Sequence, residues 1–513
     1  MHWRHVVVLV PFALISALAS VWTIWEQKFH SGASGPEWSQ SWLERLIIAG
    51  RAIWFYLGKL IWPHPLIFIY PRWEINSSEL TAYLPLVATL AGLFVLWVNR
   101  RRGMHPLLFA AAYFVISLFP VLSFFNVYFF RYSLVSDHFQ YLASIGPLAL
   151  AGAGIIYGIT FIGWKPFLQP VVCGILLSTL GILTWRQTAI YSDVKSLYKD
   201  TLAKNPDCWM AHYNLGIALR AEGKTDDAIA HYRQAVALRP DYADAHYNLA
   251  RILVEKGEVD EAITHYEKAL TVNSADAETH NNLGSALFQI GRVDEAIGRY
   301  QQALAIQPDY ADASFNLANA LLSKGDTDAA MIYYLAGLAQ SPNQPNEQYD
   351  LANALLRKGR TDEAIIHYEK VLELRPDNAD AHTNLGNAFL QKGRTQDALG
   401  QYRDALRFAP ENVAAKSNLA WLLATCSEPS VRNGPEAVLL AEEVNRLSGG
   451  NRPISLRILA AAYAEAGRFS DAVQTAKDAL LLAHAQNNAI LVEALPKEIA
   501  LYESGLPYHR EPK

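Results

Sequence analysis

The chain of 513 residues contains little cysteine and little charge. Three cysteines over this length exclude a disulfide scaffold. Charged residues make up 18% of the chain, against about 25% in typical soluble domains. The hydrophobic share of 51% excludes strong intrinsic disorder, because so much apolar surface needs burial. A net charge of −5 and a pI near 6.3 exclude a generic nucleic-acid binder, so nucleic acid is not an expected partner.

The sequences before and after Trp185 differ in character. Residues 1–185 contain 11 Lys and Arg against 6 Asp and Glu, and they hold 11 of the 13 tryptophans. Tryptophan favours membrane interfaces, where its ring is buried and its N–H stays hydrated. The remainder of the chain is acidic. We therefore expect a membrane domain over residues 1–185, followed by a water-soluble part.

Five apolar stretches in the first part are long enough to cross about 30 Å of hydrocarbon. A cluster of three arginines at residues 100–102 lies in the short turn between the second and third stretches, and such clusters stay cytoplasmic. The sequence therefore predicts a multi-pass membrane protein with everything after Trp185 extracytoplasmic, which in a bacterial inner membrane means periplasmic. The predicted spans are His5–Trp25, Thr81–Val98, His105–Phe125, Ala143–Trp164 and Pro166–Trp185.

Two features complicate this topology. Residues 17–19 (Ala-Leu-Ala) resemble a signal-peptidase site, although the apolar run continues beyond them and favours an uncleaved anchor. Residues 46–70 are apolar but contain Arg51 and Lys59, and a sixth span there would move the arginine cluster outside. We expect residues 43–73 to form an interfacial or re-entrant segment whose Arg and Lys side chains extend to the lipid headgroups.

A motif recurs every 34 residues in the second part. The units contain Asn-Leu followed by Gly or Ala, with Asp350 in place of the asparagine in one of them. A glycine, an alanine and a tyrosine follow at fixed offsets, and most units end at a proline. Six regular units span residues 209–412, and diverged units with an insertion span 413–486. Residues 186–208 match the second half of a unit, and residues 487–513 are expected to form a capping helix and a polar tail.

The repeated positions have physical reasons. A glycine of the Gly223 type ends the first helix of a unit in a left-handed turn. Gly216 and its equivalents leave room for the partner helix at an alanine such as Ala228. This pattern resembles the tetratricopeptide repeat, which implies stacked helix pairs in a stiff α-solenoid. The expected fold is therefore all-α, with about five transmembrane helices followed by a tetratricopeptide solenoid.

The repeated asparagines form the first candidate site. In this repeat family the first helix of each unit lines the concave groove, and an amide side chain both donates and accepts hydrogen bonds. A ladder of amides can thus hold an extended peptide irrespective of its sequence, as in the nucleocytoplasmic sugar transferases with long tetratricopeptide superhelices. The alternative is that these amides bond within the solenoid. The ladder comprises Asn214, Asn248, Asn282, Asn316, Asn384 and Asn418.

Histidines also recur at the repeat spacing. A metal ladder of His212, His246 and His280 is disfavoured, because stacked units hold them too far apart for one ion and no second ligand type recurs beside them. We expect surface histidines instead. The sequence shows no metal site, no phosphate loop and no nucleophile with an evident base.

Polar residues of the first part form the second candidate site. They lie on the interfacial segment and between the third and fourth spans, on the same predicted side of the membrane. Together they predict a basic cleft for the anionic headgroup of a lipid-linked ligand; the alternative is interface anchoring with an Arg–Asp ion pair. The residues are Arg51, Lys59, Arg72, Arg131, Asp137 and His138.

Three segments carry a further resemblance. Residues 50–60 (GRAIWFYLGKL) with 68–73 (FIYPRW), and residues 136–141 (SDHFQY) followed by two spans and repeats, resemble one family. These are the transmembrane and tetratricopeptide-repeat protein O-mannosyltransferases and their bacterial relatives. The resemblance implies a GT-C-like glycosyltransferase that moves a sugar from a polyprenyl-phosphate carrier to Ser or Thr. No other cofactor is evident.

The catalytic part of that family pattern has no counterpart here. The family carries an adjacent acidic pair in its first extracytoplasmic loop, where this chain has only Glu26, Glu37 and Glu44, each without an acidic neighbour. We assign no catalytic residue and expect the acceptor-binding and carrier-docking part of a transferase, inactive alone. A separate catalytic subunit or a further N-terminal part would complete it. The rival function is a non-catalytic scaffold for assembling envelope protein complexes.

Overall fold

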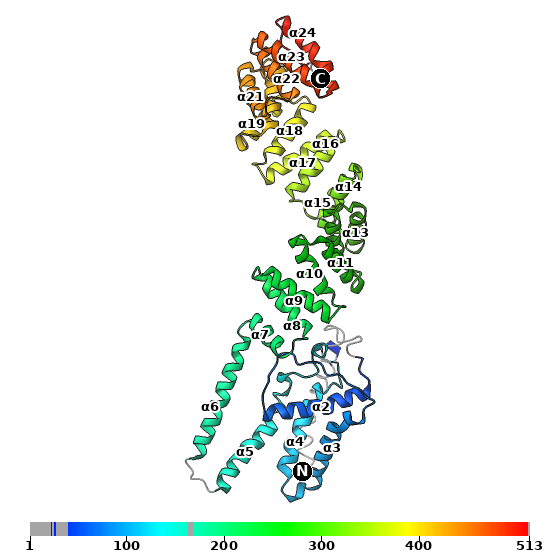
Figure 1. Ribbon diagram of the computed structural model, residues 1–513, viewed down its shortest axis with the longest axis vertical. Coiled ribbons are helices and arrows are strands. Elements are labelled where there is room, and N and C mark those ends of the chain that lie inside the picture. Colours follow the sequence, from blue (N-terminus) through cyan, green and yellow to red (C-terminus); the bar gives the residue numbers. More distant parts are fainter. Residues whose placement is uncertain (1–21, 23–24, 27–38, 127, 163–167, 511–513) are drawn as a thin grey trace. The chain divides into compact units, whose positions relative to one another are not determined.

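The computed structural model describes residues 22, 25–26, 39–126, 128–162 and 168–510, and every regular element among them is a helix (Figure 1). The predicted all-α class is confirmed for this part of the chain. The chain divides into a first unit, residues 1–272, and a second unit, residues 273–513. The first predicted span, His5–Trp25, lies almost entirely outside the described residues.

The apolar helices of the first unit coincide with four of the predicted spans. Helix α3 packs against α2 and α4, and α4 packs against α5. The four helices are α3 (Leu84–Val98), α4 (His105–Leu118), α5 (Ile145–Phe161) and α6 (Leu168–Thr188), and α2 (Trp42–Ile61) lies outside the predicted spans.

The lengths of these helices support fewer spans than the sequence predicted. Among the described residues, two stretches are long and apolar enough to cross a membrane, Leu80–Val98 and Pro170–Tyr191. The apolar stretches His105–Val121 and Ile145–Phe161 are shorter. The prediction of about five spans therefore stays a prediction.

Helix α2 lies within the segment that the sequence predicted to be interfacial or re-entrant. Ser41 and Glu44 form a reciprocal capping box at its N-terminus. Ile48, Ala52 and Tyr56, four residues apart, are buried on one face. Residues 62–79 follow without regular structure.

A half repeat connects the apolar helices to the repeats of the first unit. Helix α7 (Val194–Lys204) packs against α8, the first helix of the first full repeat. Lys204 Nζ donates to the carbonyl of Leu66 at 2.9 Å, and Asn205 Nδ2 donates to the carbonyl of Ile69 at 3.1 Å. The segment after α2 is thereby attached to the start of the repeats.

The repeats are helix pairs that follow the predicted period of 34 residues. The turn glycines have φ between +73° and +87°, as predicted. The pairs of the first unit are α8 (Trp209–Ala221) with α9 (Thr225–Leu238) and α10 (Ala243–Lys256) with α11 (Val259–Val272). The regular pairs of the second unit are α12 (Ala277–Gln289) with α13 (Val293–Ile306), α14 (Ala311–Ser323) with α15 (Thr327–Gln340), α16 (Pro345–Arg357) with α17 (Thr361–Leu374), and α18 (Ala379–Gln391) with α19 (Thr395–Phe408).

The diverged units complete the second unit. Helices α20, α21 and α22 contact one another, α22 pairs with α23, and α24 packs on α23 as a capping helix. Their bounds are α20 (Val413–Thr425), α21 (Gly434–Leu447), α22 (Pro453–Glu465), α23 (Phe469–Ala485) and α24 (Ala489–Glu503).

The role predicted for Gly216 and its equivalents was wrong in one respect. A Cβ atom on Gly216 would lie 2.8 Å from Cε1 of Tyr232, and one on Gly284 would lie 2.7 Å from Cε1 of Tyr300. The glycine therefore makes room for the buried tyrosine ring of the second helix, rather than for its alanine. Spacing alone cannot distinguish the two, because both residues recur with the same period.

The expectation of surface histidines was also wrong. His246 is 2% exposed and His280 is 6% exposed, because this position faces the second helix of the unit. Nε2 of His246 lies 3.0 Å from the carbonyl oxygen of Pro240, and its Nδ1 lies 2.8 Å from Nδ1 of His265. His212 makes the same two kinds of contact one repeat earlier. Burial, reinforced by His246, lowers the pKa of His265 to about 4.

Replacing Gly284 by valine should destabilise the fold. The added side chain meets the Tyr300 ring, and overpacking of this kind costs about 1–3 kcal/mol. Gly298→Val is the matched control, since a Cβ there meets no atom within 4 Å. The stability of both variants is measured as the midpoint of thermal unfolding, followed by the helical circular dichroism signal. Equal midpoints for the two variants would contradict the packing role of the glycine.

The histidine pair should make stability depend on pH. The folded-state pKa of His265 is depressed below the unfolded value of about 6.5, so its stabilisation is complete above pH 6.5 and is lost as the pH falls toward 4. The expected loss is about 2–3 kcal/mol. His265→Gln copies the His382–Gln401 contact of 2.6 Å and should reduce this loss. The thermal unfolding midpoint of each protein is measured at pH 7.5 and at pH 4.5. If the midpoint falls by the same amount in both proteins, His265 is not the source of the pH dependence.

Candidate functional site

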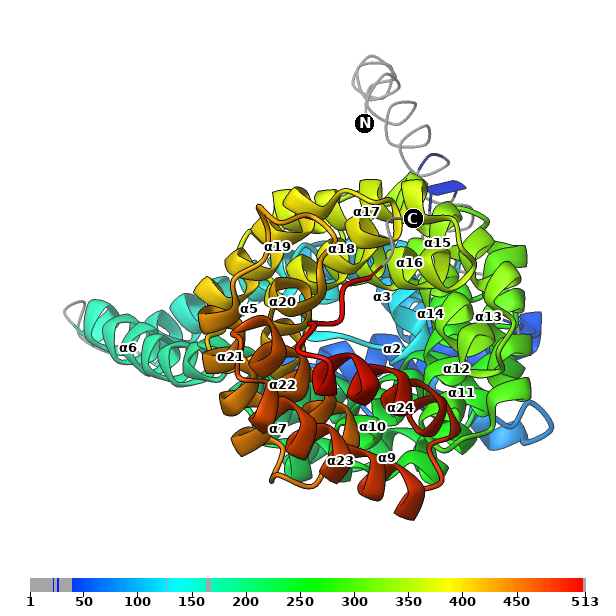
Figure 2. The same cartoon turned by 90° about the horizontal axis from the view of Figure 1, so that it is seen from above.

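The first helices of the second unit lie along one side of its curve, which we call the inner face (Figure 2). Helix α12 contacts α14, α16 contacts α18, and α20 contacts α22. Figure 2 shows these helices on the inner side of the curve and the second helices α13, α15, α17 and α19 on its outer side. The predicted asparagines of the second unit lie on these first helices.

These asparagines connect neighbouring first helices through hydrogen bonds. In three of them Nδ2 donates to the Oδ1 of an asparagine on the preceding first helix. Asn384 also donates to the hydroxyl of Tyr349 at 2.9 Å. The three contacts are Asn316 to Asn281 (2.9 Å), Asn384 to Asn353 (3.1 Å) and Asn418 to Asn387 (2.9 Å).

The structure reveals a second row of amides that the sequence analysis missed. Asn319 and Asn387 lie three residues after Asn316 and Asn384 on the same helix face, and Asn353 lies three residues after Asp350, which stands there in place of an asparagine. The hydroxyls of buried tyrosines on the second helices donate to their Oδ1 atoms, at 2.6 Å for Tyr368 to Asn353 and 2.7 Å for Tyr402 to Asn387. The signal was present in the sequence as Asn-Leu-Ala-Asn and Asn-Leu-Gly-Asn.

The hydrogen bonds orient the two rows in opposite senses. Oδ1 of Asn387 accepts from Tyr402 and from Asn418, so its Nδ2 protons point away from the scaffold. Nδ2 of Asn418 is directed at the scaffold, so its Oδ1 lies on the other side. Burial raises the pKa of Tyr402, which keeps the proton that its hydroxyl donates. Donors of one row and acceptors of the other are thus one helical turn apart, which suits the N–H and C=O of a peptide.

The remaining ladder residues make different contacts. Asn214 Nδ2 donates to the carbonyl of Met210 in its own helix at 2.9 Å. Asn248 Nδ2 donates to the hydroxyl of Tyr213 at 2.9 Å, and Oδ1 of Asn282 accepts from its neighbour at 3.4 Å. The amide donors of the ladder therefore bond largely within the solenoid, which was the alternative interpretation. Both rows are asparagine on α14 and α18, whereas Asp350 occupies the first-row position on α16 and Trp421 occupies the second-row position on α20.

The structure divides the predicted headgroup cleft between two places. In the first place, the hydroxyl of Tyr70 donates to Oδ1 of Asp137 at 2.8 Å, and Nδ1 of His138 lies 2.7 Å from Oγ of Ser136. Lys59 lies over the Tyr70 ring at 5.2 Å. Burial raises the pKa of the Asp137 carboxyl. Arg51 lies apart from this cluster and donates to the carbonyl of Glu74 at 3.3 Å.

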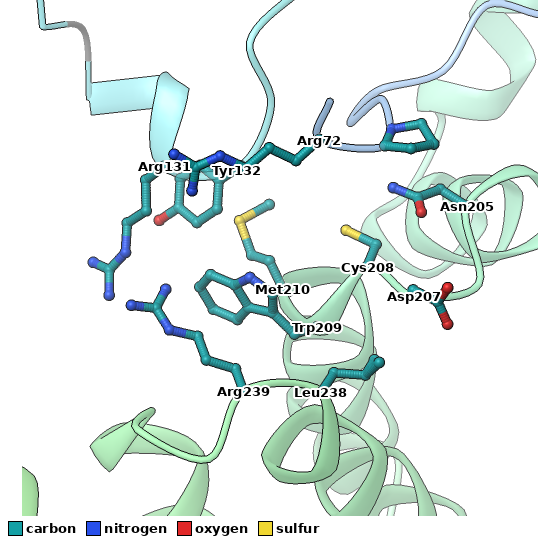
Figure 3. A pocket seen from close by; sticks show the side chains of 11 residues that line it. Arg72, Arg131, Tyr132, Asn205, Asp207, Cys208, Trp209, Met210, Leu238 and Arg239 are labelled. Carbon is teal, nitrogen blue, oxygen red and sulfur yellow. The ribbon is translucent and has the colours of Figure 1, made fainter. Parts of the chain in front are cut away.

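In the second place, Arg72 and Arg131 line a cavity of about 430 Å³ at the start of the repeats (Figure 3). Trp209 lies beside both Arg131 and Arg239. The guanidinium carbon of Arg239 is 4.4 Å from the centre of the Trp209 ring, and that of Arg131 is 5.8 Å away. The other lining residues are Pro71, Tyr132, Asn205, Asp207, Cys208, Met210 and Leu238.

The charge of this cavity favours an anionic ligand. Three arginines and one acid, Asp207, line the cavity, and Arg239 is also paired with Asp241 outside the lining at 3.2 Å, so the arginines still outnumber the acids and concentrate positive potential in a concave site. The sequence analysis missed Trp209 and Arg239 because they belong to the repeats. The signal was that Trp209 occupies a position held by Ala, Pro or Val in the following units. Among the described residues, no group of three or more His, Cys, Asp or Glu is placed to hold a metal ion.

Comparisons with known proteins agree with the repeat pattern. A sequence model of the tetratricopeptide-repeat family matches residues 195–230, 216–278, 281–345 and 349–423. A search of curated protein sequences gave no match.

Several solved structures are similar to parts of the chain. A crystal structure of MamA is 28% identical and covers 32% of this chain and 97% of its own, with a TM-score of 0.31. PilF of Pseudomonas aeruginosa is 24% identical and covers 41% and 96%, with a TM-score of 0.37. YrrB, described as a TPR protein with an unusual peptide-binding site, is 23% identical and covers 36% and 95%, with a TM-score of 0.34. The family match and the observed helix pairs together show that the chain carries tetratricopeptide repeats from residue 195 to residue 423.

Proposed function

We propose that the chain holds extended protein segments on the inner face of its repeats and is anchored in a membrane by the helices that precede them. Tetratricopeptide domains bind protein or peptide partners. The observation that carries the proposal is the pair of amide rows on α14 to α20, interrupted by Asp350 on α16 and ending at Trp421 on α20, with donors in one row and acceptors in the other. Because peptide units are common to all proteins, such a surface binds segments of many sequences.

The exposed apolar side chains of the first unit support membrane anchoring. Phe94 of α3 is 62% exposed, Phe161 of α5 is 80% exposed, and Leu177 and Trp185 of α6 are 68% and 80% exposed. Water-soluble proteins rarely expose contiguous apolar surface of this kind, whereas a bilayer would cover it. With the arginine cluster at residues 100–102 in the cytoplasm, the repeats would be extracytoplasmic and, in a bacterial inner membrane, periplasmic.

The cavity at the start of the repeats supports a finer proposal, in which it docks a polyprenyl-phosphate-linked sugar. Arginine binds phosphate through two parallel hydrogen bonds, and the cavity holds three arginines. The chain would then resemble the acceptor-binding and carrier-docking part of a protein O-mannosyltransferase. Sugar transfer would need catalytic acids from another subunit or from a further N-terminal part. The rival scaffold function would use the inner face but not the cavity.

Replacing Asn353 and Asn387 together by aspartate should weaken peptide binding at least tenfold. Aspartate keeps the oxygen that accepts from Tyr368 and Tyr402, but it removes the Nδ2 donors that face away from the scaffold. Fluorescence anisotropy with a labelled, unstructured Ser/Thr-rich peptide measures the binding.

The matched control adds the same charge on second helices. Gln301→Asp with Gln396→Asp places two carboxylates at exposed positions of α13 and α19. This control should bind the peptide like the unmodified chain, and all proteins should keep their helical signal. If the asparagine variant retains full affinity, the amide rows are structural only.

Replacing Arg72 and Arg239 together by alanine should weaken the binding of a short-chain prenyl phosphate by tenfold or more, since each phosphate–arginine contact contributes about 1.5–3 kcal/mol. Arg51→Ala is the control, because Arg51 lies outside the cavity. Titration calorimetry in detergent measures the affinity, and the prenyl alcohol reports lipid binding without phosphate. Carrier docking at this cavity is excluded if Arg51→Ala has the same effect as the double variant.

A further inference from the structure

The last described residues of the chain form an extended segment beside the first helices α20 and α22 (Figure 2). We call residues 506–510 the tail. Gly505 has φ +71°, and the amide of Leu506 donates to the carbonyl of Leu501 at 3.0 Å, so the chain turns back as soon as α24 ends. The tail then runs along the inner face of the diverged repeats.

The tail contacts this surface through its backbone and through three side chains. The amide of Arg510 donates to the carbonyl of Thr425 in the last turn of α20 at 2.9 Å. The Tyr508 ring is 6.2 Å from the Trp421 ring and also packs on the apolar cluster of α22, α23 and α24. Nε2 of His509 lies 2.7 Å from Oε2 of Glu465, and the guanidinium carbon of Arg510 is 5.3 Å from the Trp421 ring centre.

Trp421 occupies the position of the second amide row in α20. It follows Asn418 by three residues, as Asn387 follows Asn384 on α18. The Trp421 ring is held in place by Arg457, whose guanidinium carbon is 4.6 Å from the ring centre and which forms an ion pair of 2.6 Å with buried Glu498. The tail therefore lies at the end of the amide rows, against an aromatic ring in place of an amide.

We infer that this end of the inner face is a docking site for extended protein segments in which a tyrosine precedes basic residues, and that the tail is its resident occupant. The inference rests on the proposed function, because it takes the inner face as the binding surface and adds a preferred segment chemistry. Trp421 receives the aromatic ring and the cation, Glu465 receives a basic side chain, and the Thr425 carbonyl receives a backbone N–H.

Tethering makes the tail a competitor of external segments. A short connection to α24 gives the tail an effective concentration on the order of 1 mM at this site. With a Kd of about 0.1 mM for the untethered tail sequence, this effective concentration weakens the binding of any external segment about tenfold while the tail remains in place. Removing the tail should therefore strengthen the binding of an external segment about tenfold.

The experiment compares the full chain with a variant that ends at Leu506 and so keeps the C-terminal turn of α24. The probe is a fluorescein-labelled peptide with the sequence of residues 505–510, and the control probe has serine in place of its tyrosine and arginine. The shortened chain should bind the first probe at least tenfold more tightly than the full chain does, and should prefer it over the control probe. Trp421→Ala in the shortened chain should abolish that preference.

A second variant covers the case in which the truncation loosens α24. The double substitution Tyr508→Ser with Arg510→Ser keeps the full length and should give the same gain in probe affinity, with circular dichroism reporting the helical content. The inference is overturned if the folded variants bind both probes equally or bind neither. This outcome is distinguishable from a failure of the proposed function. If only the inference fails, the Asn353 and Asn387 variant would still lose binding of the Ser/Thr-rich peptide, whereas the tail variants would not change the affinity for the tail probe.

Discussion

The burial of one tyrosine in each repeat connects the packing of this solenoid to its surface. The ring of Tyr402 lies against Gly386 so closely that a Cβ on that residue would be 2.7 Å from Cε1. The two helices of the unit can approach each other only because the facing residue is small. The tyrosine hydroxyl emerges at the first helix and donates to Asn387. One packing contact thus sets both the distance between the helices and the orientation of an amide on the inner face.

That orientation gives the inner face its chemical polarity. An asparagine side chain on a solvated surface can present either end, but Asn353 and Asn387 have their oxygens occupied by tyrosine hydroxyls and by the next amide row. Their donors are therefore preorganised, and a ligand does not have to order them on binding. The tail uses the end of the same surface, where its backbone N–H reaches the carbonyl of Thr425.

The first unit uses the same scaffold for a different chemistry. Its first repeat begins with Trp209 and ends at Arg239, and the segment after α2 supplies Arg72. Guanidinium groups gather around one indole ring, where the later repeats have a small side chain. Two kinds of surface thus arise from one repeat by substitution at single positions, because the helix pair keeps its geometry whatever the exposed residue is.

The sequence by itself determined the helix pairs, their period, the left-handed turns at Gly223 and its equivalents, and the predicted amide row, because spacing and turn chemistry are local properties. It also contained the second row of amides, in the i and i+3 spacing of Asn384 and Asn387. Only the tertiary structure decided which neighbour each side chain meets. It placed His246 against His265, and the Tyr402 ring rather than an alanine against Gly386. It also placed Arg72 and Arg131 beside Trp209 but apart from Asp137, and the tail against Trp421. These contacts join residues on different elements, and a periodic pattern carries no information about the partner that covers a given face.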